Sequence, residues 1–197
     1  MKELLLIAVG SALVNNVVLS QFLGICPFLG VSKKLDSAVG MSAAVIFVMA
    51  LATSVTWPIY TYLLEPNGMA YLQTIVFILI IAVLVQLVEI ILKKFMPPLY
   101  KALGVYLPLI TTNCTILGVT ILNIDNGYDF AESIVCAAGA GIGFLVAMVL
   151  FSGVRRRVEE AVTPKCFEGL PITLVAAAVT SLSFMGFGGI VESIFGA

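Results

Sequence analysis

The sequence predicts an all-α integral membrane protein in which six transmembrane helices form two inverted repeats of three helices each. Two observations predict the membrane class. The mean hydropathy is +1.15, and only 11% of the 197 residues are charged, about half of what the surface of a soluble domain requires. A third observation, a cysteine motif that occurs twice, predicts the repeat.

Six apolar stretches have about the 20 residues that a helix needs to cross a bilayer. They cover residues 4–23, 39–64, 70–92, 99–122, 130–154 and 170–195. We therefore expect a single membrane domain over 1–197, with the first repeat in 1–95 and the second in 96–197. Because each half holds an odd number of spans, the second half enters the membrane from the opposite side.

Basic residues predict the orientation of these spans. Nine of the ten lysines and arginines fall in loops on one side, which the positive-inside rule assigns to the cytoplasm. Both termini are therefore expected outside. The net charge of -1, without a basic stripe, gives no reason to expect nucleic-acid binding. The nine residues are Lys33, Lys34, Lys93, Lys94, Lys101, Arg155, Arg156, Arg157 and Lys165.

The repeated motif reads ICPFLGVS at 25–32 and NCTILGVT at 113–120, so Cys26 corresponds to Cys114. Counting about 1.5 Å per residue from the flanking polar residues places both thiols within about 5 Å of the centre of a core about 30 Å thick. The first span is too long for this depth if it is straight, so it must tilt, begin along the interface or break near 24–27, where Pro27 follows Cys26. We predict that the first and fourth helices are broken.

Two thiols related by the repeat in mid-membrane have two explanations. Buried cysteines commonly pack as small hydrophobic side chains. Because a thiolate is tolerated there only beside a cation, ligation of a metal or iron–sulfur centre is the sharper hypothesis. Such a cluster needs four ligands. Cys136 and Cys166 have no counterpart in the other half, so we expect Cys136 to pack, Cys166 to lie in a loop, and the missing ligands to come from another polypeptide.

Amides and hydroxyls flank both cysteines within apolar sequence. They are candidates to hydrogen-bond cluster sulfurs, which tunes the potential of such a centre. The alternative is ordinary hydrogen bonding between helices. The candidates are Asn15, Asn16, Asn113 and Thr112, next to Thr111.

Other features have simpler explanations. Glu89 is an acid within the predicted span 70–92 and a candidate for ion handling, although pairing with Lys93 one turn later is the simpler role. Gly139 and Gly143 are expected to permit close helix packing. Aromatic residues at the outer ends of the second and third spans form an expected interfacial belt: Trp57, Tyr60, Tyr62 and Tyr71.

The motifs and their surroundings resemble the A subunits of the Rnf family of membrane complexes. The resemblance covers the whole chain and rests on LVNN at 13–16, FLGICPFLGVSKKL at 22–35, LPLITTNC at 107–114 and FMGF at 184–187. It implies an ion-pumping ferredoxin:NAD⁺ oxidoreductase of the bacterial cytoplasmic (inner) membrane, with this chain as a translocase subunit that is inactive alone.

The resemblance also implies partners and a cofactor. The chain would pair with the similar, oppositely oriented E subunit of Rnf around an intramembrane [2Fe–2S] cluster and supply Cys26 and Cys114 as ligands. The B, C, D and G subunits and membrane lipid would complete its surroundings. The chain would then relay electrons across the membrane, coupled to Na⁺ or H⁺ transport.

Three alternatives stay open on the sequence. The E subunit of the sodium-pumping NADH:quinone oxidoreductase is homologous, although the asparagine pair and the first motif resemble the Rnf form more. Secondary transporters also use inverted repeats with broken helices, but no charged pair lies at the predicted midplane. An assembly scaffold would use its cysteines for packing only. Iron analysis and EPR separate these classes.

Overall fold

A computed structural model describes residues 2–32, 35–95, 113–161, 164, 167 and 169–195. In this part of the chain every regular element is a helix and no strand is present, which confirms the all-α prediction there. The elements are α1 (Lys2–Val9) with the π-helix η1 (Gly10–Val14), α2 (Ile25–Val31), α3 (Leu35–Ile59) with the π-helix η2 (Tyr60–Leu64), the 3-10 helix η3 (Ala70–Leu72) with α4 (Gln73–Phe95), α7 (Cys114–Asp125), α8 (Phe130–Glu159) and α9 (Leu170–Phe195).

Three helices in the described residues are long and apolar enough to cross a membrane. They are Leu35–Leu64, which joins α3 to η2, Gln73–Ile91 within α4, and Phe130–Glu159, which is α8. They correspond to the second, third and fifth predicted spans. α9 matches the bounds of the sixth, and α7 supplies the end of the fourth, whose beginning at 99–112 lies outside the described residues.

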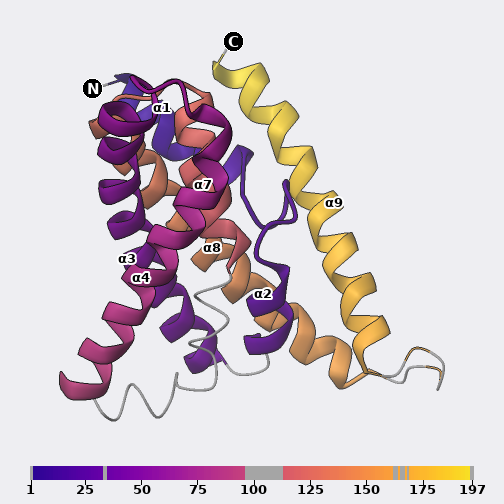
Figure 1. Cartoon of the computed structure of the whole chain (residues 1–197). Helices are drawn as coiled ribbons and strands as arrows, with labels where there is room; N and C mark the ends of the chain where they lie inside the picture. Colours follow the sequence, from indigo (N-terminus) through magenta and orange to yellow (C-terminus); the bar gives the residue numbers. More distant parts are fainter. Residues whose placement is uncertain are drawn as a thin grey trace.

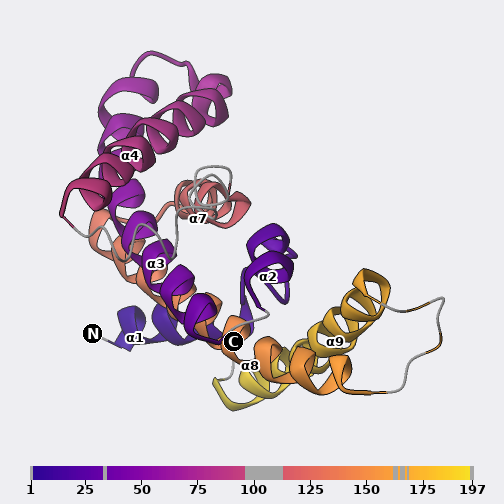
Figure 2. The same cartoon turned by 90° about the horizontal axis from the view of Figure 1, so that it is seen from below.

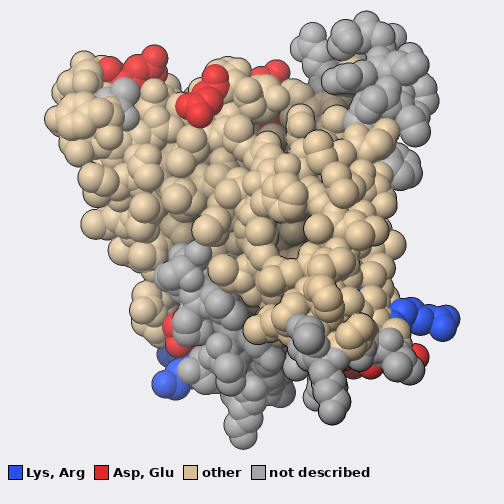
Figure 3. All heavy atoms as spheres, turned by 90° about the vertical axis from the view of Figure 1, so that its right-hand side faces the viewer, with Lys and Arg blue, Asp and Glu red and all other residues tan. Residues whose placement is uncertain are grey.

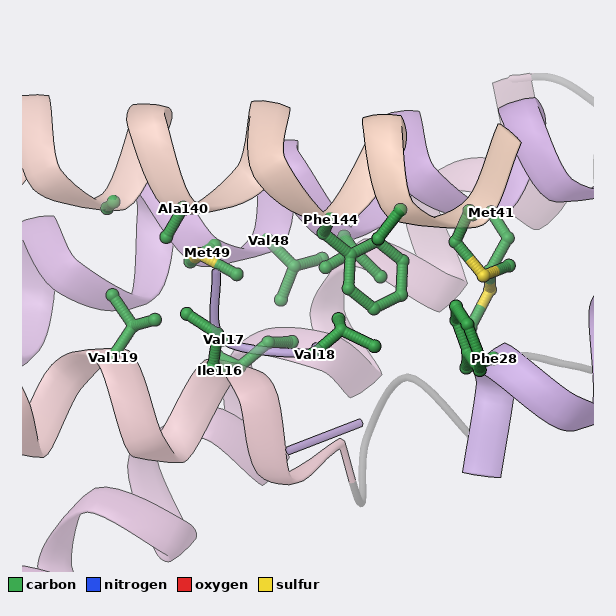
Figure 4. Packing of buried hydrophobic residues seen from close by; sticks show 14 of the residues in the cluster. Val17, Val18, Phe28, Met41, Val48, Met49, Ile116, Val119, Ala140 and Phe144 are labelled. Carbon is green, nitrogen blue, oxygen red and sulfur yellow. The ribbon is translucent and has the colours of Figure 1, made fainter. Parts of the chain in front are cut away.

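The long helices α3 and α8 pack against each other and form the centre of the fold (Figure 1). Their buried side chains recur at helical spacing and meet those of α7 (Figure 4). Within a bilayer, lipid is as apolar as the core, so dense van der Waals packing stabilises these contacts. The labelled core residues of the three helices are Met41, Val48 and Met49 on α3, Ala140 and Phe144 on α8, and Ile116 and Val119 on α7.

α8 also packs closely on α1 and η1 through small residues. A Cβ added at Gly139 would lie 2.7 Å from the Ala8 carbonyl oxygen, and one at Gly143 would lie 2.7 Å from that of Ala12. Both separations are shorter than real Cβ contacts, so only glycine permits this approach of the two backbones. The expected role of Gly139 and Gly143 in close helix packing is confirmed.

The two helices that begin with the cysteine motifs lie on the same side of the α3–α8 pair. Figure 2 shows α2 and α7 between α4 and α9, with α1 on the other side of the pair. Along the bundle, α7 lies toward the end that carries both chain termini, and α2 lies toward the opposite end (Figure 1). The two motifs therefore approach the middle of the bundle from opposite ends.

The first predicted span, 4–23, is not one helix. η1 ends at Val14, the backbone runs through turns to Gly24, and α2 begins at Ile25. The break is therefore earlier and longer than predicted. Pro27 does not cause it, because Pro27 lies in the first turn of α2, where the N–H that proline lacks has no intrahelical partner.

Asn16 stabilises the backbone of this break. Its Oδ1 accepts hydrogen bonds from the N–H groups of Val18 (3.1 Å) and Leu19 (3.3 Å). Its Nδ2 donates to the carbonyl oxygens of Ala12 (3.2 Å) and Gly143 (2.9 Å). The buried amide thus replaces hydrogen bonds that the interrupted helix no longer makes.

Charged side chains gather at the two ends of the bundle (Figure 3). In that view the lysines and arginines that can be seen lie at the end away from the chain termini, whereas acidic side chains are seen at both ends. Three arginines predicted to lie in a loop, Arg155, Arg156 and Arg157, are part of α8, because this helix continues to Glu159. Arg155 is moreover buried, so it is not a surface marker of topology.

Candidate functional site

In both cysteine motifs the cysteine side chain lies on the surface of the chain. Cys26 lies in the first turn of α2, Cys114 is the first residue of α7, and both are exposed. The later positions of each motif point into the core, so the correspondence seen in sequence also holds in space. The buried positions after the cysteines are Pro27, Phe28, Val31 and Ser32 in the first motif and Thr115, Ile116, Val119 and Thr120 in the second.

Gly24 brings the two motifs together. It is buried and has φ +78°, the left-handed conformation that favours glycine. A Cβ there would overlap Thr115 Oγ1 and would lie 3.1 Å from Asn113 Oδ1. Gly24 precedes Cys26 by two residues, and Asn113 and Thr115 flank Cys114. The chain therefore places the two thiol-bearing turns side by side.

The first turn of α7 contains buried polar atoms that have no hydrogen-bond partner in the described part of the chain. Asn113 is the N-cap, and its Oδ1 accepts a hydrogen bond from the N–H of Thr115 at 3.0 Å. Asn113 Nδ2 and Thr115 Oγ1 have no hydrogen-bond partner among the described residues, although both side chains are buried. Buried polar atoms are normally paired, so these two are available to a further group beside Cys114.

The opposite end of α2 is held by α8. The buried Arg155 donates from Nη1 to the Leu29 carbonyl oxygen and to Ser32 Oγ, the latter at 2.8 Å. One turn earlier on α8, the Phe151 ring stacks on Phe28 with centroids 4.1 Å apart. These contacts fix the short helix that carries Cys26.

The predicted polar neighbours of the cysteines have different surroundings. Asn113 lies directly at Cys114 with its Nδ2 unpaired among the described residues. Asn16 bonds backbone groups through both its amide atoms, as the alternative of structural hydrogen bonding expects. Asn15 is exposed at the end of η1, and Thr112 lies outside the described residues.

The remaining candidates lie apart from the two motifs in sequence. Cys136 is half-buried on α8, which agrees with a packing role. Cys166 lies outside the described residues. Glu89 is half-buried on α4, and both its pairing with Lys93 and a role in ion handling stay predictions.

The sequence matches a family model described as "Rnf-Nqr subunit, membrane protein" over residues 4–191. The chain belongs to the Rnf-Nqr family. The resemblance inferred from the cysteine motifs is thereby confirmed, and so is the membrane class predicted from composition.

Members of the Rnf-Nqr family with assigned names are similar along almost the whole chain. The A subunit of the Na(+)-translocating ferredoxin:NAD(+) oxidoreductase complex of Acetobacterium woodii is 56% identical over 186 residues, which cover 94% of this chain and 97% of the relative. The A subunit of an ion-translocating oxidoreductase complex is 53% identical over 191 residues in Syntrophotalea carbinolica, covering 97% and 99%. The protein of that name in Aliivibrio fischeri is 50% identical over 192 residues, covering 98% and 100%.

Sequence reasoning about this Rnf-Nqr protein missed three contributors to the site. Gly24 belongs to the stretch 24–27 where a break is one of the expectations, but its left-handed conformation and its contacts with Asn113 and Thr115 are not predicted. Thr115 directly follows Cys114 but is not among the predicted polar neighbours of the cysteines. Arg155 opens a run of three arginines that was interpreted only as a cytoplasmic charge cluster. The hydroxyl at the end of the first motif, Ser32, was the available clue to a polar partner.

Proposed function

We propose that this chain is the A subunit of an ion-translocating ferredoxin:NAD⁺ oxidoreductase and that Cys26 and Cys114 hold half of a [2Fe–2S] cluster shared with a homologous subunit. One observation carries the proposal: both cysteines are exposed, while the rest of each motif is largely buried. Thiols that served only as packing groups would point into the core with their neighbours. Here they face outward, where a partner subunit can complete the ligand set.

The residues present fit such a cluster. Thiolates are its usual protein ligands, and hydrogen bonds to its sulfur atoms tune its potential. Asn113 Nδ2 and Thr115 Oγ1, which have no partner within the described ranges, lie on either side of Cys114 in sequence and are buried. They are suited to donate to sulfur. Thr112, Asn15 and Asn16 were predicted for the same role, and of these Asn16 already uses its amide for backbone hydrogen bonds.

When bound, the cluster supplies reversible one-electron redox chemistry. The residues of this chain bind the cluster and shield it from water. Cys26 and Cys114 would bind as thiolates, and the positive end of the helix dipole of the twelve-residue α7 favours the negative sulfur of Cys114. Phe28 and Ile116 seal the inner side of the site against water, since both are buried in the core.

The partner follows from ligand number and charge. Two thiolates complete half of a four-ligand site, and an incompletely ligated iron centre in hydrocarbon would carry uncompensated charge. We propose the oppositely oriented E subunit of Rnf as the source of the other two cysteines. The B, C, D and G subunits would be its further partners in the complex.

The chain would contribute six spans in two inverted repeats, and three features support this. α2 and α7 approach the middle from opposite ends, each leads into a long helix, and those two helices pack as a central pair (Figure 1). The basic end of the bundle would lie in the cytoplasm of a bacterial inner membrane, with both termini outside. The exposed apolar side chains of α4 suit contact with lipid.

The comparisons favour this function over its rivals. The relatives at about half identity are named as A subunits of oxidoreductase complexes, not as transporters or as the E subunit of the quinone-linked enzyme. The relative from Acetobacterium woodii is named for Na⁺, so Na⁺ is the first coupling ion to test here and H⁺ the second.

Substitution of each cysteine in the complete complex tests the proposal. Cys26→Ser and Cys114→Ser are each expected to remove the iron and the EPR signal of the intramembrane cluster. Cys136→Ser and Cys166→Ser serve as matched controls and should retain both. An unchanged signal in either of the first two variants would refute the ligand assignment.

A further inference from the structure

We propose that Arg155 is the positioning residue that fixes Cys26 at the shared site. Its effect on a cluster rests on the proposed function. The contacts that carry the proposal are properties of this chain alone: a buried cation on α8, the C-terminal end of α2, and a thiol on the first turn of that same short helix.

α2 has little of its own to hold it in place. It has only seven residues, and the last four carbonyl oxygens of any helix lack intrahelical partners. Its N-cap is Gly24, which has no side chain to satisfy the first N–H groups. The position of α2 therefore depends on groups supplied by neighbouring elements.

Arg155 supplies those groups. Nη1 donates to the Leu29 carbonyl oxygen and to Ser32 Oγ (2.8 Å), and Nε donates to Glu159 Oε1 (3.0 Å). The positive guanidinium also lies at the negative end of the helix dipole of α2. Ser32 is fully buried and Arg155 is only 6% exposed, so water does not readily replace these contacts.

The hydrogen bonds from Arg155 to α2 form a clamp that fixes the position of α2. A second contact between α8 and α2 also fixes the rotation of α2 about its axis. Phe151, one turn before Arg155 on α8, stacks on Phe28 with an interplanar angle of 23°. Two contacts a turn apart on one helix prevent α2 from turning about its axis. Cys26 lies about 4.5 Å along that axis from Leu29, at about 1.5 Å per residue, so a rotation of α2 moves the thiol directly.

Different contacts fix the position of Cys114. α7 has twelve residues and begins with a side-chain N-cap from Asn113. Its other end is joined to the next helix by Asn123, which donates to the Ser133 carbonyl oxygen at 3.3 Å. Loss of Arg155 should therefore affect Cys26 and leave Cys114 in place, which distinguishes a positioning role from general stabilisation.

The first experiment needs no cluster. Two versions of the chain, each retaining only Cys26 or only Cys114 among its four cysteines, are assembled with the other subunits in membranes and treated with N-ethylmaleimide. Arg155→Gln should raise the reaction rate of Cys26 by roughly fivefold, the factor equivalent to about 1 kcal/mol for one lost hydrogen bond, and change that of Cys114 by less than about twofold.

Arg156→Gln is the matched control. The Arg156 side chain is 84% exposed and forms an ion pair with Glu160 at 3.7 Å on the same helix, so its substitution should change neither rate. Equal acceleration of both cysteines by Arg155→Gln, or no acceleration of Cys26, would overturn the proposal. If Arg155→Gln fails to assemble, Ser32→Ala removes one acceptor of the clamp and should accelerate Cys26 alone.

The second experiment connects the clamp to the proposed cluster. In the complex with all cysteines present, Arg155→Gln should shift the midpoint potential of the cluster or broaden its EPR lines. Arg155→Lys should give an effect between that of Arg155→Gln and that of the native chain. Arg156→Gln should leave the midpoint potential and the EPR lines unchanged. A native complex without a cluster would refute the proposed function, while the maleimide rates would still decide the role of Arg155. A cluster signal unchanged in Arg155→Gln would refute the link between the clamp and the cluster.

Discussion

Gly24→Ala is expected to disturb the junction between the two cysteine motifs. Gly24 has φ +78°, and an added Cβ would overlap Thr115 Oγ1 and lie 3.4 Å from Phe144 Cε2. Thr115 is fully buried in the first turn of α7, and Phe144 is fully buried on α8. Neither can move aside freely, so the substitution must push the Gly24 backbone away from α7.

Two terms set the loss in free energy of unfolding that Gly24→Ala causes. A left-handed backbone costs a residue other than glycine about 1–2 kcal/mol. Forcing an additional methyl group into a filled core costs about 1–3 kcal/mol more. Gly127→Ala isolates the first term, because Gly127 has φ +66° and a methyl group added there would have nothing within 4 Å. The packing term alone then corresponds to roughly a 5- to 150-fold difference between the two variants in the unfolding equilibrium.

The assay is SDS titration of the purified complex, with protease resistance of this chain as the measure of folding and iron content as the measure of the site. Gly24→Ala should unfold at lower SDS than Gly127→Ala and should lose iron, because the two thiol-bearing turns move apart. Equal midpoints and equal iron in the two variants would refute the claim that Gly24 joins the motifs.

Three further outcomes are expected. The variants Asn67→Cys and Asn126→Cys, both at exposed turns near the end that carries the termini, should react with an impermeant maleimide added from outside. The native Cys166 should react only after the membrane is opened. The opposite sidedness of labelling would overturn the predicted orientation. Expressed alone, the chain should be colourless and unstable, and co-expression with the E subunit should restore iron and yield, whereas stoichiometric iron in the lone chain would contradict a shared site. Asn113→Ser keeps an N-cap but removes the Nδ2 donor, so the free energy of unfolding should change by less than about 0.5 kcal/mol. The cluster potential, measured by redox titration, should fall, and an unchanged potential would exclude the proposed hydrogen bond to sulfur.

Composition and periodicity were sufficient for much of the fold. Apolar length predicted the helices over 39–64, 70–92, 130–154 and 170–195, and each is found within a few residues of its predicted bounds. Helix length in a membrane protein follows directly from bilayer thickness, which is why this inference works. The break in the first predicted span was placed wrongly, because Pro27 was weighed by residue type and not by its position in a helix turn.

The sequence alone determined the membrane class and, through the duplicated motif, which two cysteines correspond. Tertiary structure decided what surrounds them. The close approach of Gly24 to Asn113 and Thr115 and the clamp of Arg155 on α2 depend on contacts between segments about 90 to 130 positions apart in the chain. No local pattern encodes such contacts, because a buried polar group is defined by the partners that the fold brings to it.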